Sequence, residues 1–231
     1  MDFSYNNIDA ATYNFKLISK TPPQKARRQY QSIVIPNRDS PVIKLNDNYE
    51  SYFLTYVGKC NNTDLDNIYN WLQDTGNLID GDDTTKYYKV VACEKAQTER
   101  LSETLRMITV TFECMPFRYV VDNFVVTSTS NNFQLENTGK KYSRPQYLLT
   151  TSATSGQLKV NLSSKPLTFS NVDVGTKIMI DTELMIVYNY DDNTSLLQKT
   201  NGLLPFLNVG NNLIQTTGVS QIEILKNERW F

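Results

Sequence analysis

The chain has 231 residues, enough for one large or two modest domains that each bury a core of their own. Lysine and arginine total 23 against 24 aspartate and glutamate residues, so the net charge of -1 provides no basic field for phosphates, and nucleic acid and membrane surfaces become poor candidate partners. Histidine is absent, which excludes Ser-His-Asp and Cys-His nucleophile systems and His-bearing zinc sites.

Cysteine spacing and strand propensity set the expected compartment and fold class. Cys60, Cys93 and Cys114 form no Cys-x-x-Cys pair, so we expect reduced thiols in a cytoplasm. The first residues lack a basic region followed by an apolar stretch, and no apolar run approaches the ~18 residues of a membrane helix. Abundant Asn, Thr and Ser, with 14 Tyr and 10 Phe, predict a mainly β protein.

The first half predicts strands around a single helix. Apolar and aromatic runs at residues 30–36, 42–45 and 52–60 are separated by turn residues. Residues 64–72 place apolar side chains on one helical face, with Thr63 as the expected N-cap and Gly76 as the expected left-handed end. Residues 86–94 and 107–114 predict a long hairpin whose charged connection, residues 95–106, projects as a solvated ribbon or lies against a neighbour.

The second half predicts an antiparallel sandwich of short strands. The polar segment 127–132 indicates a linker, and we place the domain boundary near residue 125. The expected strands are residues 133–135, 146–149, 158–162, 167–169, 178–180, 184–190, 196–199 and 221–225. The last of these is assigned either to the second domain or to the first.

Several short motifs predict turns or core packing and not catalytic or binding sites. Asp80-Gly81-Asp82-Asp83 lacks the spacing of a calcium loop and predicts a turn, as does Asp191-Asp192-Asn193. Gly139-Lys140-Lys141 lacks the Ser or Thr of a phosphate loop. Tyr142, Tyr147, Tyr188 and Tyr190 fit either a sandwich core or a platform for sugar rings, and Trp71 and Trp230 are expected anchors. We therefore predict no catalytic residue, metal site or cofactor.

Short motifs, each of which occurs once, follow one another along nearly the whole chain. In the first half they include Tyr5, Asn6, Pro36, Arg38, Asp39, Trp71, Leu72, Phe112, Pro116, Phe117 and Tyr119; in the second they include Asn137, Gly139, Pro145, Pro205, Gly210 and Asn212. In this order the motifs resemble the distal tail protein of long-tailed (siphovirus) phages of Gram-positive bacteria. Asn7, Asn37 and Ser40 stand where that family has glycine, and asparagine tolerates the left-handed backbone that such turns need.

The resemblance implies a structural, non-enzymatic virion protein of two domains. Residues 1–125 would form the ring-forming domain, with one α-helix and a long hairpin, and residues 126–231 a galectin-like β-sandwich. The family forms a homohexameric ring around the DNA channel, between the tail tube protein and the tail-tip protein, and serves as a hub for host-adhesion proteins such as a receptor-binding protein. We therefore expect assembly in the host bacterial cytoplasm, a place at the distal end of the virion tail, and no membrane partner.

The hairpin is our candidate for an arm that reaches a neighbouring subunit. The arm comprises Gln97, Thr98, Glu99, Arg100, Leu101 and Ser102. Loops around Asp191 and residues 208–212 are candidate attachment points for other tail proteins. Two other readings stay open at this stage: a carbohydrate-binding adhesin module that recognises host cell-wall saccharide, and a tail-associated wall hydrolase.

Overall fold

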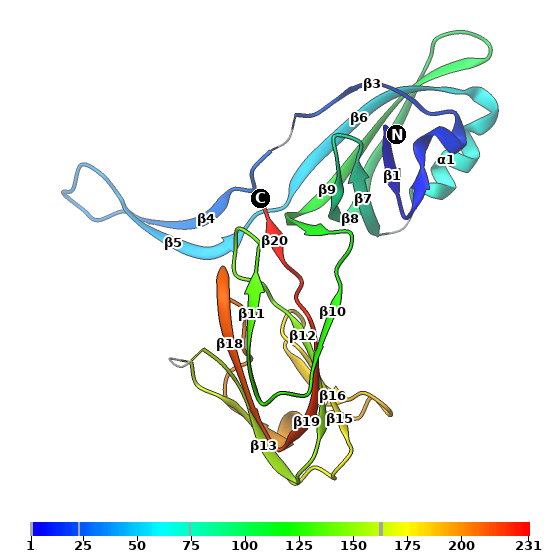
Figure 1. Cartoon of the computed structure of the whole chain (residues 1–231). Coiled ribbons are helices and arrows are strands. Elements are labelled where there is room, and N and C mark those ends of the chain that lie inside the picture. Colours follow the sequence, from blue (N-terminus) through cyan, green and yellow to red (C-terminus); the bar gives the residue numbers. More distant parts are fainter. Residues whose placement is uncertain (1, 23, 74, 162–163) are drawn as a thin grey trace. The chain divides into compact units, whose positions relative to one another are not determined.

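The computed structural model describes residues 2–22, 24–73, 75–161 and 164–231 (Figure 1). The chain divides into two compact units, one formed by residues 1–121 with Phe231 and the other by residues 122–230. The division lies four residues before the boundary predicted at 125. Both units consist mainly of antiparallel strands, so the predicted mainly β class is confirmed.

The first unit is built on one antiparallel sheet in the strand order β2-β1-β7-β8-β9-β6-β3. These strands are β1 (Phe3–Tyr5), β2 (Ile8–Asp9), β3 (Lys16–Lys20), β6 (Tyr52–Asn61), β7 (Gly76–Asp80), β8 (Asp83–Arg100) and β9 (Leu105–Val120). Along β6 and β9 buried side chains alternate with more exposed ones, because successive side chains of a strand point to opposite faces. The buried set forms the apolar core of the unit, together with side chains of the helix.

The predicted helix is present, but its ends differ from the prediction. A 3₁₀ turn η2 (Asn62–Asp64) leads into α1 (Leu65–Trp71), where Asp64 is the N-cap residue and makes no side-chain cap, so Thr63 does not cap the helix as expected. Gly76 does not end the helix in a left-handed turn; it opens β7. A Cβ at Gly76 would lie 1.8 Å from the Asn6 Oδ1 atom, so a larger residue here would displace the Asn6 side chain from its present position.

Strands β4 (Arg28–Ile33) and β5 (Val42–Tyr49) form a separate two-stranded sheet. Among the described residues the two strands pair only with each other, and the hairpin extends away from the main sheet of the first unit (Figure 1). The sequence predicts a longer first strand, through residue 36, and a shorter second one, ending at residue 45. In the structure, residues 34–41 form the connection instead.

The long hairpin predicted in the first unit is confirmed, and its strands are longer than expected. Most of residues 95–106, expected as a connection, continue the β8–β9 ladder to the pair Arg100↔Arg106. The register shifts where Pro116 lies, between the pairs Val90↔Cys114 and Tyr88↔Arg118. Proline cannot donate a ladder hydrogen bond, so a bulge at this position is expected.

The second unit is a sandwich of two antiparallel sheets, as predicted. One sheet has the order β10-β19-β12-β15-β16 and the other β11-β18-β13-β14-β17. Inward side chains of both sheets, such as Tyr147, Ile180 and Ile214, form one apolar core. The strands are β10 (Val125–Ser128), β11 (Asn132–Asn137), β12 (Gln146–Thr151), β13 (Ser155–Val160), β14 (Leu167–Ser170), β15 (Lys177–Asp181), β16 (Ile186–Asn189), β17 (Thr200–Asn201), β18 (Gly210–Thr217) and β19 (Val219–Leu225). The short β20 (Arg229–Trp230) follows them in the chain and belongs to neither of these sheets.

Several expectations for the second unit are wrong in detail. The segment 127–132, expected as a linker, contains the end of β10 and the start of β11. Residues 196–199, expected as a strand, contain a 3₁₀ turn η3 (Leu197–Lys199), and β18, an interior strand of its sheet, is not predicted at all. Residues 221–225 belong to β19, which pairs with β10 and β12 within the sandwich and, among the described residues, not with the first unit. Residue 162 of the strand expected at 158–162 lies outside the described residues.

The cysteines are free thiols in the structure. Cys60 and Cys114 are buried, and burial raises the pKa of the Cys114 thiol to about 12. In the part of the chain that the structure describes, no helix is both long and apolar enough to cross a membrane.

Candidate assembly surfaces

Six of the eleven family-motif residues of the first unit are buried. The Trp71 indole donates a hydrogen bond of 2.9 Å to the main-chain oxygen of Tyr5, which ties the helix to β1. The Tyr5 ring lies 5.1 Å from the ring of Phe112 in β9, and Leu72 and Tyr119 are also buried. Tyr5, Trp71, Leu72 and Phe112 belong to the core that joins the helix to the sheet, so their contacts are structural.

Two positions where the resembling family has glycine adopt the backbone that glycine favours. Asn6 and Asn7 join β1 to β2 with φ angles of 51° and 65°, and Asn37 has a φ of 64°. Asn6 also accepts a hydrogen bond of 3.0 Å from the Asn77 amide through its side chain. Asparagine at these positions therefore adopts the left-handed backbone that glycine favours.

The motif residues of the second unit anchor the loop before β18. The Asn137 side chain donates to the main-chain oxygens of Lys141 and Leu207, at 3.1 and 3.3 Å, and accepts from Gly139. The buried Asn212 side chain both accepts from and donates to the Asn208 main chain at 2.8 Å. Pro205 is buried in the same loop, and Gly210 has a φ of 85°.

Pro145 lies apart from that loop, before β12. Its main-chain oxygen accepts a 2.7 Å hydrogen bond from the Thr182 hydroxyl, so it connects two loops of the sandwich.

The candidate arm lies at the tip of the β8–β9 hairpin, where all of its residues are exposed. Gln97 to Arg100 form the end of β8, and Leu101 and Ser102 form the turn. Glu99, Arg100, Glu103 and Arg106 make this tip strongly charged but close to neutral overall. Its role as an inter-subunit arm stays a prediction.

The β4–β5 hairpin is a second exposed element, and the sequence reasoning did not single it out. Tyr30 lies opposite Leu45, and Ile43 lies two residues along on the same face. Their exposed fractions are 46%, 57% and 50%, and at the connection Val34 is 81% exposed. A two-stranded hairpin is at best marginally stable in water, and its free edges are templates for another chain.

Pro36, Arg38 and Asp39, three of the family-motif residues, lie in the connection of this hairpin and are exposed. The hairpin could have been recognised from these motif residues and from the charges at Lys44 and Asp47, which are unusual in strands of a core. The sequence instead predicts residues 30–36 and 42–45 only as two of the strands of the first half.

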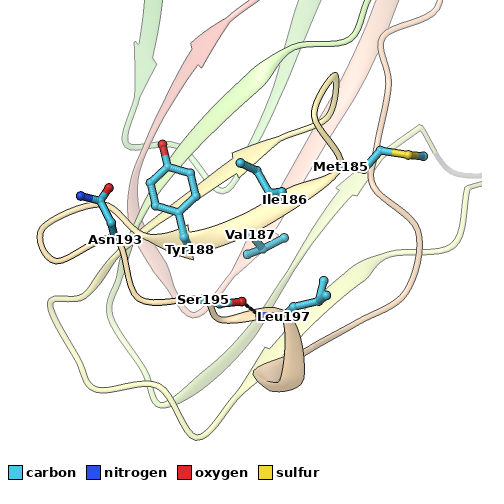
Figure 2. A pocket seen from close by; sticks show the side chains of 7 residues that line it. All are labelled: Met185, Ile186, Val187, Tyr188, Asn193, Ser195 and Leu197. Carbon is cyan, nitrogen blue, oxygen red and sulfur yellow. Dashed lines mark hydrogen bonds between the residues drawn. The ribbon is translucent and has the colours of Figure 1, made fainter.

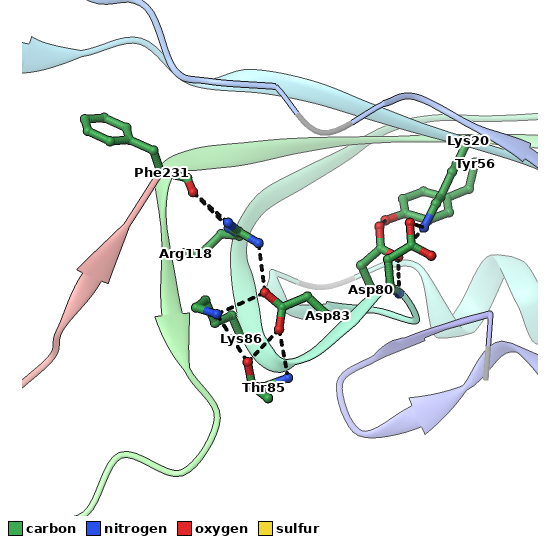
Figure 3. A network of polar contacts seen from close by, with 9 residues as sticks. Lys20, Tyr56, Asp80, Asp83, Thr85, Lys86, Arg118 and Phe231 are labelled. Atoms are coloured by element: carbon green, nitrogen blue, oxygen red, sulfur yellow. Dashed lines mark hydrogen bonds and ion pairs between the residues drawn. The ribbon is translucent and has the colours of Figure 1, made fainter. Parts of the chain in front are cut away.

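The acidic segment between β7 and β8 is neutralised by cations of the first unit (Figure 3). Lys20 forms ion pairs of 2.5 Å with both Asp80 and Asp82, and the Tyr56 hydroxyl donates to Asp80 at 3.0 Å. Burial by itself lowers the pKa of Lys20, but the hydrogen bonds and charges of the two carboxylates outweigh it and raise that pKa above its usual value.

Asp83 takes part in a second ion-pair network. It pairs with Lys86 at 3.0 Å and with Arg118 at 3.1 Å. Hydrogen bonding from Thr85, and then from Lys86, lowers the pKa of the Asp83 carboxyl. The described residues contain no group of three or more His, Cys, Asp or Glu side chains that could hold a metal ion.

A pocket of about 380 Å³ lies beside β16 in the second unit (Figure 2). It is lined by Met185, Ile186, Val187, Tyr188, Asn193, Ser195 and Leu197. Asn193 belongs to the turn at Asp191, where the sequence predicts an attachment loop. The mostly aliphatic lining suits apolar side chains better than a saccharide, whose hydroxyl groups need several polar partners.

No known family model matches the sequence, and no curated protein matches it. Among solved structures, the chain is similar to the Dit protein (gp 19.1) of phage SPP1, which is described as a paradigm of the hub adsorption apparatus in Gram-positive infecting phages. The TM-score is 0.75 and the identity 17%, and the match covers 96% of this chain and 97% of that chain. The chain therefore has the fold of the SPP1 Dit protein over nearly its whole length, which confirms at the level of the fold the resemblance to distal tail proteins.

Proposed function

We propose that this protein is a structural subunit of a siphophage tail, where it acts as the distal tail hub of the adsorption apparatus. The observation that carries the proposal is the likeness in fold to the SPP1 Dit protein across both units. The ordered sequence motifs support it independently, because they span the same two units. The carboxylates of residues 80–83 also support a structural role, because Asp80, Asp82 and Asp83 form ion pairs with lysine and arginine side chains of the same unit.

The finer proposal is a homohexameric ring around the DNA channel, with the tail tube protein on one side and the tail-tip protein on the other. Identical subunits close into a ring through heterologous contacts, in which two different surfaces of the chain meet. Two exposed hairpins of the first unit supply projecting elements. We assign the main contact to the β4–β5 hairpin because it exposes apolar side chains at Tyr30, Ile43 and Leu45.

Further partners follow from the same role. The loops at Asp191 and at residues 208–212 are the attachment points that we propose for the adhesion proteins of the tail. The virion tail is the proposed location, with assembly in the host cytoplasm.

Native mass spectrometry of the purified chain, with negative-stain images, tests the proposal. Six copies of the 26.5 kDa chain weigh 6 × 26.5 = 159 kDa, and we expect that mass with a sixfold ring. A chain that stays monomeric also when mixed with the tail-tip protein would contradict the ring and favour the adhesin reading.

Paired substitutions test the proposed contact. Ile43→Lys and Leu45→Lys place charges on the exposed face of β4–β5 and should shift the mass toward monomer, because a charge buried in an apolar contact is costly. Val174→Lys is the matched control, since Val174 is an exposed aliphatic residue of the second unit (63%). Rings that survive both hairpin substitutions would exclude this face as the contact.

A further inference from the structure

Phe231 lies in an aromatic cluster at the root of the β4–β5 hairpin. Its ring centroid is 5.4 Å from that of Tyr49, the last residue of β5, and 5.5 Å from that of Phe117 in β9. Tyr49 and Phe117 lie 5.2 Å apart, so the three rings form a closed triangle. One ring belongs to the hairpin, one to the main sheet, and the third joins them.

The segment that leads into β4, the other strand of the hairpin, contributes to the same contact. Lys25, which precedes β4, places its ammonium 4.9 Å from the centroid of the Phe231 ring. This distance is within the range of a cation–π attraction. The Glu50 amide donates to the Arg27 main-chain oxygen at 2.9 Å and closes the root between the two strands. Phe231 therefore contacts both chain segments at the root of the hairpin, the one that enters β4 and the one that leaves β5.

Arg118 holds Phe231 in place from the main sheet (Figure 3). Its Nε and Nη2 atoms donate to the Phe231 main-chain oxygen at 3.2 and 2.7 Å, and its Nη1 atom pairs with Asp83 at 3.1 Å. The ion pair with Asp83 thus orients the guanidinium, which donates two hydrogen bonds to Phe231 from its other side. Lys86 pairs with the same carboxylate, which fixes Asp83 in turn.

We propose that Phe231 is a latch that sets the direction in which the β4–β5 hairpin leaves the first unit. The hairpin has no ladder bonds to the main sheet among the described residues, so its direction depends on side-chain contacts at its root. Phe231 supplies such contacts to both ends of the root and is itself anchored to β9 through Arg118. Removal of Phe231 from the cluster releases the hairpin without unfolding the sheet. The latch lies within a single chain, so its action does not depend on the proposed ring.

Hydrogen exchange of the full chain, followed by mass spectrometry, tests the latch. In Phe231→Ala, amides of residues 25–33 and 42–50 should exchange about tenfold faster, because two aromatic pairs and the cation contact are lost. Amides of the β6–β9 ladder should exchange at the rate of the parent chain. Phe53→Ala is the matched control, since Phe53 is an exposed phenylalanine of the same unit (51%), and it should leave the hairpin rates unchanged.

A double-mutant cycle separates the latch from general destabilisation. If Phe231 acts through Tyr49, Tyr49→Ala added to Phe231→Ala should accelerate exchange at the root by less than the product of the two single effects. Unchanged rates at the root, equal acceleration throughout the first unit, or fully multiplicative effects would each overturn the proposal. The exchange rates are compared only between samples in the same oligomeric state, as measured by native mass spectrometry. Protection of amides by a neighbouring copy is then equal in both samples.

Discussion

Buried hydroxyl groups in the two units differ in whether they find a partner. The Tyr56 hydroxyl donates to Asp80, whereas the buried Tyr147 hydroxyl has no hydrogen-bond partner among the described residues. Burial raises the pKa of both phenols, so both stay protonated at ordinary pH. The sequence does not distinguish them, since both tyrosines lie in alternating strands.

Tyr147→Phe should therefore raise the free energy of unfolding of the second unit by about 1 kcal/mol, because an unpaired buried polar group is removed. Tyr56→Phe is the matched comparison and should lower the stability of the first unit by about 1 kcal/mol, because it removes a hydrogen bond. Urea denaturation of the full chain measures both. A loss of stability in Tyr147→Phe would show that the hydroxyl bonds a water molecule.

Lys20 stabilises the first unit through its ion pairs with Asp80 and Asp82. Lys20→Met should cost about 1–3 kcal/mol, because it leaves the largely buried Asp80 without its cation. The same change at the exposed Lys59, Lys59→Met, should have little effect. Thermal denaturation at pH 7 checks the difference, and equal effects of the two substitutions would show that the ion pairs contribute nothing.

The pH dependence of this contribution follows from the raised pKa of Lys20. The stabilisation is fully present below the ordinary lysine pKa of about 10.5 and is lost as the pH rises through the higher value of the folded state. The difference between the parent chain and Lys20→Met should thus shrink in strongly alkaline solution. A difference that stays constant to high pH would contradict this assignment.

At the scale of elements, the β1–β2 turn tests the glycine replacements. Both of its central residues have positive φ, which a β-branched side chain adopts only with strain. Asn7→Val should lower the stability of the first unit by about 1–2 kcal/mol, while Asn7→Gly should stay within about 0.5 kcal/mol of the parent. Chemical denaturation distinguishes the two; equal stabilities would mean that the turn rearranges.

The two exposed hairpins are alternative candidates for the main contact of the ring, and changes in each should affect the ring differently. Deletion of residues 97–102 shortens the charged tip of β8–β9 and, if this arm reaches a neighbour, weakens the ring. Native mass spectrometry at several protein concentrations compares this deletion with Leu45→Lys in the other hairpin. An unchanged ring after the deletion would exclude the arm, and we expect the larger effect from Leu45→Lys because an apolar contact loses more when a charge is buried.

At the scale of the whole molecule, salt separates the two contacts. The Debye length falls to about 3 Å at 1 M salt, so ion pairs that the charged β8–β9 tip would form with a neighbour are screened, while apolar contacts that β4–β5 would form are not. We expect the ring to persist in 1 M sodium chloride, measured by light scattering. Dissociation with increasing salt would instead favour the charged tip as the main contact.

The sequence by itself determined the mainly β class, the position of the helix, the long hairpin and most strands of the sandwich. These features depend on local patterns: alternating apolar residues, turn residues such as Asn and Asp, and one helical face around Ile68. The ordered motifs also predicted the fold that the SPP1 Dit protein shares. Local errors arose where another segment decides the backbone, as at Gly76, which accommodates the Asn6 side chain.

Only the tertiary structure decided which apolar strands are exposed and which distant residues meet. Tyr30, Ile43 and Leu45 have the pattern of a core strand, yet they lie in a hairpin that pairs with no other strand among the described residues. Phe231 and Tyr49 are far apart in the sequence, and nothing local indicates that their rings meet at the hairpin root. Periodicity reports which side chains share a face, but whether that face is covered depends on contacts between segments that the pattern does not contain.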